Sequence, residues 1–456
     1  MRRHAVIVIY TFPPMGGPGV QRAVKFGKYL PESGWDLTFV TVKDVVYHAY
    51  DPTLVRALPP EIEVVRTDSA DPLRIAYLLR KLRGRFTNRD RIDPHVKVSA
   101  DTPAKAQILR LYRTLQSWVF VVDPQVLWIP FAVAAGVRAV RARNSAVVVA
   151  MPQPRSTALA GYLISLFTGR PLVLDMRDPW TQDPYYRMPT ALHRKVNEWL
   201  ESRVIRYASE LVVISDSMRQ AIIDRYPELA DRITVITNGF DSEDFVGAPQ
   251  APKDGRFDIV YTGSLYNHHV PVFRVFCAGL RTLLHRRPEL ATRVRLRLVG
   301  RIEREIDELL TEENVRHLTD ITGYVSHAEA IGFTKAADLL LLLIKNDLDE
   351  KRDVITIPGK FFEYMASRRP ILYLGPQCEA SKILQRTGQG NAVALDPEEI
   401  AREIERNIDE RVTDRIDHTV IDTYERRNQA GKMASIMDRA YEIQPSRQAK
   451  TTNALG

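Results

Sequence analysis

The sequence predicts an α/β protein built from two doubly wound parallel sheets. Its 456 residues are about two to three times the length of an ordinary domain, so two substantial cores are expected. Apolar runs alternate with helical segments, and this alternation occurs twice along the chain. A polar stretch at 244–255, which contains Pro249 and Pro252, separates the two arrays and is typical of a linker.

The first array opens with an apolar run at 5–10 that stops before Pro13-Pro14, as expected of a strand buried on both faces. A glycine-containing turn at 16–19 leads into a helix predicted at about 20–30. The further strands predicted in this half lie at 37–42, 61–66, 146–150, 171–175, 210–215 and 233–236, with helices near 157–167 and 191–207.

The second array begins with a strand predicted at 257–262 and continues at 294–299, 338–343, 371–374 and 392–395. A helix is predicted from about 416 to 441, and the polar residues after it are expected to fray. We therefore expect an N-terminal domain at 1–245, a C-terminal domain at 246–414, a C-terminal helix at 415–441 and a flexible tail at 442–456. Because open α/β sheets bind ligands at the carboxyl ends of their strands, the two domains are expected to face each other across a cleft.

Composition favours a globular protein over disordered and fibrous classes, because 45% of the residues are apolar and 26% are charged. Cys277 and Cys378 are too few for a disulfide framework and lack metal-ligand spacing, so a reducing cytoplasm is the expected compartment. The apolar run near the start is too short for a signal peptide or a membrane span.

The net charge of +8 is concentrated in a basic insertion at about 71–120. Between 71 and 113, eleven Lys and Arg oppose four Asp, which leaves +7 there and +1 elsewhere. The insertion also carries Leu78, Leu79 and Leu82 at helical spacing. Three interpretations stay open: a solvated insertion whose leucines face the core, docking on an anionic membrane, and nucleic-acid binding, for which no known motif is present.

The turn Gly16-Gly17-Pro18-Gly19 lies between a buried strand and a helix, where glycines let the backbone approach a ligand and free amides attract phosphate. A dinucleotide fingerprint is excluded because Arg22 stands where glycine or alanine is needed and Lys43 stands where an acid is needed. No Walker loop is present either. An active-site loop and a plain tight turn both remain open.

A second cluster, Pro358-Gly359-Lys360 followed by Glu363, opens a helical pattern. Lys360 is expected near the amino end of that helix, where its ammonium and the free amides together can bind a diphosphate. Glu363 lies three residues on, on the same side, and can accept hydrogen bonds from ribose hydroxyls. The alternative is an ordinary surface pair of a lysine and a glutamate.

Other polar segments have open interpretations. Arg177 could bind an anion and Asp178 could accept a hydroxyl proton, because both follow a predicted strand, but a buried structural ion pair is an equal alternative. Asp347-Leu348-Asp349 lies in a dense charge run, and His268-His269 has no partner at metal-ligand spacing. No metal site is therefore predicted.

A set of motifs resembles the retaining glycosyltransferases of the GT-B fold, specifically the large family four. The motifs are Pro13-Pro14-x-Gly16-Gly17-x-Gly19-x-Gln21-Arg22, Arg177-Asp178-Pro179-Trp180, Val213-Ile214-Ser215, Thr237-Asn238-Gly239-Phe240-Asp241, Tyr261-Thr262-Gly263-Ser264 and Pro358-Gly359-Lys360 through Glu363-Tyr364. They occur in the family's order over about residues 5–440. The resemblance implies two Rossmann-like domains and a C-terminal helix that crosses back to the first domain.

The resemblance also implies that the C-terminal domain holds a nucleotide-diphosphate sugar and that the N-terminal domain presents a hydroxyl acceptor. Together with the patterns above, it gives the donor-binding candidates Gly16, Gly19, Gly263, Ser264, Arg301, Tyr324, Pro358, Gly359, Lys360 and Glu363. The catalytic candidates are Lys360, Glu363, Gly17 and Asp178. The acceptor-side candidates are Gln21, Arg22, Arg177 and Asp178.

The chain departs from the family pattern in its charges. The earlier of the family's paired glutamates falls at Ile355, and Ser264-Leu265-Tyr266-Asn267-His268 stands where an Arg and a Lys usually neutralise the diphosphate. Lys360 is the candidate for the lost charge, with Arg301 as the alternative. The usual acceptor-side histidine is missing from Met151-Pro152-Gln153-Pro154-Arg155-Ser156.

We therefore expect an enzyme: a metal-independent glycosyltransferase that moves a hexose-like sugar with retention and needs no cofactor beyond the sugar donor. The expected acceptor is a lipid-linked or polysaccharide intermediate at the cytoplasmic face of the plasma membrane, with possible contact to anionic lipid. The alternatives are a nucleotide-sugar 2-epimerase and a catalytically silent scaffold subunit that binds a nucleotide sugar.

Overall fold

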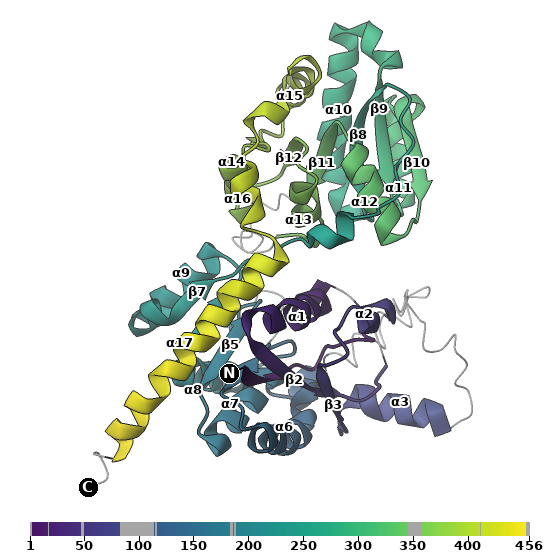
Figure 1. Cartoon of the computed structure of the whole chain (residues 1–456). Helices are drawn as coiled ribbons and strands as arrows, with labels where there is room; N and C mark the ends of the chain where they lie inside the picture. The colour runs from purple at the N-terminus through teal and green to yellow at the C-terminus, as the bar shows by residue number, and fades with distance from the viewer. Residues whose placement is uncertain are drawn as a thin grey trace. The chain divides into compact units, whose positions relative to one another are not determined.

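In the computed structural model the chain forms two compact units, one of Met1–Thr237 with Gln429–Gly456 (unit 1) and one of Asn238–Asn428 (unit 2). The structure describes residues 2–16, 18–46, 50–82, 114, 116–182, 186, 188–344, 357–410 and 412–452. Each unit contains one parallel sheet with helices packed on it (Figure 1). The predicted fold class, two doubly wound parallel sheets, is confirmed.

The sheet of unit 1 has seven parallel strands in the order β3-β2-β1-β4-β5-β6-β7. All seven occupy the places that the apolar runs predicted, with small shifts at their ends. The strands are β1 (Arg3–Val8), β2 (Trp35–Val42), β3 (Glu63–Thr67), β4 (Val147–Ala150), β5 (Leu172–Met176), β6 (Glu210–Val213) and β7 (Ile233–Val235). The helices are α1 (Pro18–Tyr29), α2 (Thr53–Arg56), α3 (Pro72–Leu82), α6 (Ile129–Arg143), α7 (Ser156–Thr168), α8 (Ala191–Tyr207), α9 (Asp216–Arg225) and α17 (Arg426–Thr452).

The central strands of unit 1 are buried because helices cover both faces of the sheet. One core joins β1, β2 and β4 to apolar residues of α1 and to Ala430, Met433 and Met437 of α17. On the opposite face α7 lies directly on β4, since a Cβ added at Gly161 would come within 2.4 Å of the Ala150 Cβ. Figure 1 shows α17, in yellow, running along this unit.

The C-terminal helix differs from its predicted range of 415–441. It begins at Arg426, and a separate short helix, α16 (His418–Asp422), precedes it within unit 2. Asp417 caps α16 by accepting hydrogen bonds from the amides of Thr419 and Val420. The helix α17 then continues to Thr452, into the segment expected to fray.

The helix α3 packs against the rest of unit 1 through polar side chains and exposes its apolar side. Arg74 donates to Asp68 at 2.8 Å, and the Tyr77 hydroxyl donates to Asp44 at 3.3 Å. Four apolar side chains at helical spacing are 37–82% exposed: Ile75, Leu78, Leu79 and Leu82. The interpretation in which these leucines face the core is therefore wrong, and most of the basic insertion, 83–113, lies outside the described residues.

The sheet of unit 2 has six parallel strands in the order β10-β9-β8-β11-β12-β13. The strands are β8 (Phe257–Thr262), β9 (Val294–Val299), β10 (Thr319–Gly323), β11 (Leu339–Leu343), β12 (Ile371–Leu374) and β13 (Ala392–Val393). The edge strand β10 was not predicted, because its sequence contains only one large apolar residue, Ile321. An edge strand pairs on one side only and needs fewer apolar residues than a central one.

Five consecutive leucines in β11 supply both cores of unit 2, as expected of a strand buried on both faces. Leu339 and Leu341 pack with the helices α10, α11 and α15. Leu340 and Leu342 pack on the other face with α13 and α14. The helices are α10 (Val270–Arg286), α11 (Arg304–Glu312), α12 (His327–Ala336), α13 (Gly359–Ala366), α14 (Glu379–Thr387) and α15 (Pro397–Asp409).

Candidate functional site

Three loops meet at the carboxyl ends of β8, β9 and β10 in unit 2. The amide of Gly263 donates to the Val299 carbonyl at 2.8 Å, and the amide of Leu265 donates to the Arg301 carbonyl at 2.9 Å. Gly300 bridges to Gly323. The predicted donor-side residues Gly263, Ser264, Arg301 and Tyr324 therefore lie on neighbouring loops at one edge of the sheet.

Glycine is required where these loops cross. Gly263 and Gly300 have φ of +107° and +137°, a region that other residues rarely adopt. A Cβ added at Gly300 would lie 2.4 Å from the Gly263 carbonyl oxygen, so the two backbones are in direct contact. The loops after β8 and β9 are therefore packed backbone to backbone at the carboxyl ends of these strands.

The helix α13 brings the second predicted cluster to the same edge. Pro358 is its N-cap and Gly359 its first residue. Four buried side chains fix the helix on the sheet: Phe361, Phe362, Tyr364 and Met365. The Tyr364 hydroxyl accepts a hydrogen bond from the amide of Thr262 at 2.7 Å, which ties α13 to the end of β8.

Lys360 lies beside the β8 loop. A Cβ added at Gly263 would come within 3.3 Å of the Lys360 Nζ. The Nζ donates to the Tyr261 hydroxyl at 2.5 Å, and that hydroxyl donates to the Ser264 carbonyl at 3.1 Å. Burial lowers the pKa of Lys360 to about 7, and the neighbouring carboxylate of Glu363 offsets this only in part. An anion bound here would favour the charged ammonium.

Glu363 lies one turn further along α13, with 34% of its side chain exposed. Burial raises the pKa of its carboxyl group, and Asp244 raises it further, whereas His327 and Lys360 act in the opposite direction. His327 Nδ1 lies 3.9 Å from the Glu363 Oε1. The partly open carboxylate can accept hydrogen bonds from a pair of hydroxyls.

Two aromatic features border this edge. The Arg301 guanidinium lies 5.4 Å from the ring centre of Tyr324, which is 78% exposed. His269 accepts a hydrogen bond at Nδ1 from the Tyr266 amide, so its neutral ring carries the proton on Nε2. Burial, together with the charges of His268 and Lys360, lowers the pKa of His269 to about 4.

The predicted residues of unit 1 lie at the carboxyl ends of β1 and β5. Gly16 is half-buried, Gly17 lies outside the described residues, and Gly19 and the half-buried Gln21 are in α1. Arg177 is buried and donates to the Gly19 carbonyl and to the Gln153 Oε1. Its burial lowers the pKa of the guanidinium to about 10.

Asp178 is exposed and accepts a hydrogen bond from the Gln153 Nε2 at 2.5 Å. In the sequence, the segment around Gln153 was noted only as the place of a missing histidine. Tyr261 belonged to a motif without an assigned role, and His327 was not among the candidates. Two signals were available: Gln153 lies three residues after the end of the strand β4, and His327 directly follows Ser326, an N-cap residue type.

Arg22 was predicted to lie on the acceptor side, and the structure gives it a different role. It is fully buried and makes two 2.8 Å contacts with the Asp175 carboxylate. It also donates to the Thr237 carbonyl at 2.8 Å and lies 4.8 Å from the ring centre of Phe26. Its position in α1 turns the side chain inward, so Arg22 stabilises the fold and is not available to a substrate.

Two further predictions fall on residues outside the described ranges. Asp347-Leu348-Asp349 and Ile355 both lie in 345–356. The segment His268-His269 is described and lies in the 3-10 turn Asn267–His269, directly before α10, with the ring of Tyr266 stacked on both histidines.

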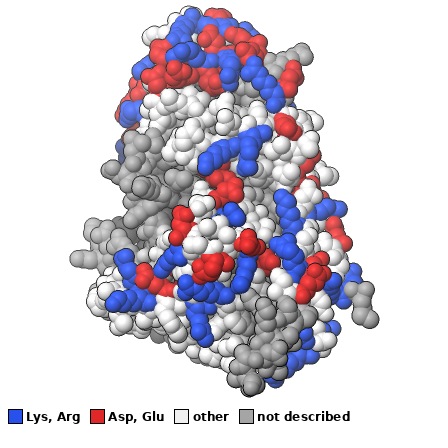
Figure 2. Space-filling view, turned by 90° about the vertical axis from the view of Figure 1, so that its left-hand side faces the viewer, with Lys and Arg blue, Asp and Glu red and all other residues white. Residues whose placement is uncertain are grey.

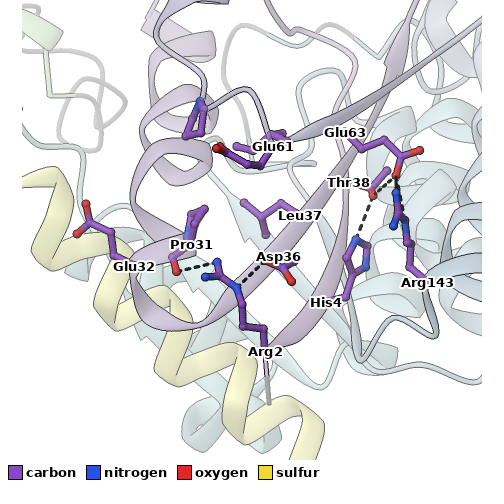
Figure 3. Close-up of a pocket in the computed structure, with 12 residues that line it drawn as sticks. Arg2, His4, Pro31, Glu32, Asp36, Leu37, Thr38, Glu61, Glu63 and Arg143 are labelled. Carbon is purple, nitrogen blue, oxygen red and sulfur yellow. Dashed lines mark hydrogen bonds and ion pairs between the residues drawn. The ribbon is translucent and has the colours of Figure 1, made fainter.

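A cavity of about 890 Å³ lies elsewhere, at the amino ends of β1, β2 and β3 (Figure 3). Its charged groups are largely paired with one another: Arg2 with Asp36 at 2.7 Å, and Arg143 with Glu63 at 3.1 Å. Ligands of open α/β sheets bind at the carboxyl ends of the strands, which is the opposite edge. The cavity is therefore separate from the candidate site.

Comparison with known proteins identifies related sequences over part of the chain. Residues 89–244 match the model of Glycosyltransferase Family 4. The alpha-maltose-1-phosphate synthase of Mycolicibacterium smegmatis is 30% identical over 99 residues, which are 22% of this chain and 26% of that protein. The match thus spans about a quarter of that relative.

Solved structures resemble the whole chain. A glycosyltransferase from Rickettsia africae has a TM-score of 0.60 at 15% identity and covers 96% of this chain and 98% of its own. Anabaena HepE in complex with UDP has a TM-score of 0.53 at 14% identity, covering 99% and 100%. A protein of Listeria monocytogenes assigned as a UDP-N-acetylglucosamine 2-epimerase has a TM-score of 0.56 at 10% identity, covering 97% of each chain.

Proposed function

Because this chain has the GT-B fold and is related through residues 89–244 to Glycosyltransferase Family 4, we propose that it is a glycosyltransferase that uses a nucleotide-diphosphate sugar. The single observation that carries the proposal is the placement of Lys360 and Glu363 at the start of α13, beside the glycine-lined loop after β8. An ammonium and a carboxylate one helical turn apart match the diphosphate and the ribose of one donor.

Each donor group has a proposed partner in unit 2. The diphosphate binds Lys360, the first amides of α13 and the backbone at Gly263 and Ser264. The ribose hydroxyls bind Glu363. The exposed Tyr324, with Arg301 on its ring, borders the base. The HepE neighbour contains UDP, which makes uridine donors the first to test.

The proposed reaction exchanges one bond at the anomeric carbon. The bond from that carbon to the donor phosphate oxygen breaks, a bond to the acceptor oxygen forms on the same face, and the acceptor proton passes to the leaving phosphate. Lys360 and the helix amides stabilise the charge that develops on the diphosphate, so the proposed step needs no metal. In unit 1, Asp178 orients the acceptor hydroxyl, and the glycine loop supplies backbone amides to a phosphate.

The experiment is a transfer assay with a panel of nucleotide sugars and hydroxyl acceptors, followed by NMR of the product. A product with the anomeric configuration of the donor supports retention. An inverted product would contradict the proposed stereochemistry, and the absence of transfer from every donor would contradict the activity.

A 2-epimerase is the alternative favoured by one fold neighbour, the Listeria protein. An epimerase needs groups that remove and return a proton on the sugar, and it converts the nucleotide sugar without an acceptor. Incubation with the donor alone separates the two activities, because only an epimerase produces an isomeric nucleotide sugar. A silent scaffold subunit would instead keep its cellular role after Lys360→Ala and Glu363→Ala.

We also propose that unit 1 contacts an anionic membrane through α3. Its outward face carries Ile75, Leu78, Leu79 and Leu82, and Lys81 is exposed beside them. The sequence from 71 to 113 has a net charge of +7. Apolar side chains next to cations are the pattern of helices that lie in the lipid headgroup region. A lipid-linked acceptor at the cytoplasmic face is consistent with this surface.

Nucleic-acid binding is not proposed, because no known binding motif accompanies the basic insertion. On the face drawn in Figure 2, the Lys and Arg of the described residues are interspersed with Asp and Glu. Among the described helices, none is both long and apolar enough to cross a membrane.

A further inference from the structure

The side-chain amide of Gln153 forms hydrogen bonds with both Arg177 and Asp178, two residues predicted on the acceptor side. Arg177, which follows β5, donates to the Gln153 Oε1 at 2.5 Å. The Gln153 Nε2 donates to the Asp178 Oδ2 at 2.5 Å. Gln153 itself follows β4, so the contact joins the carboxyl ends of two adjacent strands.

The chemistry of the partners fixes the orientation of this amide. A guanidinium has only donors, so the amide oxygen must face Arg177. The amide nitrogen must then face Asp178, whose carboxylate accepts its proton. A side chain that lacks either the acceptor or the donor cannot make both contacts.

The same amide is packed against the start of α1. A Cβ added at Gly19 would lie 2.5 Å from the Gln153 Oε1 and 3.4 Å from the Arg177 Nη1. Arg177 also donates to the Gly19 carbonyl. The glycine loop and the carboxylate of Asp178 are therefore held by one connected set of hydrogen bonds.

We propose that Gln153 is a positioning residue that holds Asp178 and the Gly19 end of the glycine loop in the arrangement needed for the acceptor hydroxyl. This inference rests on the proposed glycosyl transfer and deepens it. Gln153 acts through Asp178 and Arg177, and it need not touch the substrate.

The test is Gln153→Glu, which keeps the shape and the acceptor facing Arg177 but replaces the amide donor with a second carboxylate. At pH 8 the introduced carboxylate repels Asp178, and the turnover number for transfer should fall at least tenfold, about 1.4 kcal/mol. As the pH falls toward 5.5, one carboxyl takes up a proton and can donate to the other, so the deficit relative to wild type should shrink. The charged groups around this amide are Arg177 and Asp178, with Asp175 and Arg22 behind them.

The matched control is Gln220→Glu on α9. Gln220 is exposed and donates to Asp224 at 2.7 Å, so the substitution creates the same pair of carboxylates away from the site. This variant should retain wild-type turnover at every pH. A second variant, Gln153→Ala, removes both contacts and should lose turnover without recovery at low pH.

The outcomes separate the inference from the proposed function. A wild-type protein without transfer activity contradicts the function. An active wild type with a Gln153→Glu variant of equal turnover and unchanged pH profile contradicts the role of Gln153. A variant that loses turnover equally at pH 8 and 5.5, with a lowered melting temperature, also contradicts it, because the effect is then structural.

Discussion

Lys360 makes two contacts with Tyr261: its ammonium donates a hydrogen bond to the tyrosine hydroxyl at 2.5 Å, and it lies 3.8 Å from the centre of the tyrosine ring. The two residues are 99 positions apart, one at the end of β8 and the other at the start of α13. The ring face stabilises a cation, whereas the surrounding burial disfavours it. With both effects acting, the pKa of the Lys360 ammonium is about 7, at the place where we expect a diphosphate.

Replacing Lys360 should stabilise the empty protein and weaken donor binding. The pKa of Lys360 is about 7 in the fold against 10.5 for a free lysine, so the folded state binds fewer protons between these values. Stability therefore rises with pH across this window, and the burial penalty is largest at or below pH 7. Lys360→Met should raise the free energy of unfolding at pH 7 by about 1–3 kcal/mol in urea titrations, and the gain should vanish near pH 10.5. The control is Lys382→Met, on the exposed face of α14, which should change the free energy of unfolding by less than about 0.5 kcal/mol.

Donor affinity should depend on pH through the same ammonium. Above pH 7 the empty site must take up a proton when it binds a diphosphate, so affinity should fall as the pH rises from 7 to 9, by up to about tenfold per unit. Calorimetric titration with UDP-glucose, whose phosphates do not titrate in this range, measures the effect. The Lys360→Met variant should bind weakly and without this dependence. A wild-type affinity that is flat across the range would contradict the assignment of Lys360.

Glu363→Gln should separate nucleoside recognition from phosphate recognition. The carboxylate accepts hydrogen bonds from ribose hydroxyls in our account, and bonds to a charged group contribute about 1.5–3 kcal/mol. We expect UDP affinity to fall about tenfold or more, while inorganic pyrophosphate affinity stays equal or increases. Glu308→Gln, at an exposed pair on α11, is the control. Equal losses for both ligands would place Glu363 at the phosphates instead.

The buried pair of Arg22 and Asp175 should be the more sensitive of two ion pairs in unit 1. Arg22→Met leaves the Asp175 carboxylate buried without its partner and should lower the free energy of unfolding by about 3–5 kcal/mol. Arg2→Met breaks the half-exposed pair with Asp36 and should cost less than about 1 kcal/mol. Chemical denaturation measures both. If the two variants lose similar free energies of unfolding, the Arg22–Asp175 pair does not stabilise the fold more than the half-exposed pair.

Membrane contact should depend on the outward face of α3. The double variant Leu79→Ser/Leu82→Ser removes two exposed apolar side chains, each contributing about 1.5–3 kcal/mol when fully buried in lipid. We expect binding to vesicles containing anionic lipid to fall at least tenfold in sedimentation assays. Leu192→Ser, an exposed leucine on α8, should have no effect. Equal binding by the double variant would exclude α3 as the contact.

Most of the fold followed from the sequence because buried parallel strands are continuous apolar runs. The seven strands of unit 1 and five of the six in unit 2 were predicted in this way. The edge strand β10 was missed because it carries one large apolar residue and is buried on one side only. The break between α16 and α17 was missed because the apolar periodicity continues across it.

The candidate site was less predictable because its residues meet across long sequence separations. Motif order indicated Lys360, Glu363 and Gly263, but no local pattern indicates that Tyr261 binds Lys360 or that Gln153 binds Asp178. Arg22 is a case in which a motif was misleading. Its motif position predicted a substrate contact, whereas its place in α1 directs the side chain into the core. Burial by residues distant in sequence decided its role.

The most direct test of the account is a crystal structure of the protein with bound UDP or a UDP-sugar. We predict diphosphate oxygens within hydrogen-bond distance of the Lys360 Nζ and the first amides of α13, and ribose hydroxyls on the Glu363 carboxylate. A nucleotide bound away from the carboxyl edge of β8 and β9, with Lys360 and Glu363 making no contact to it, would contradict the central claim.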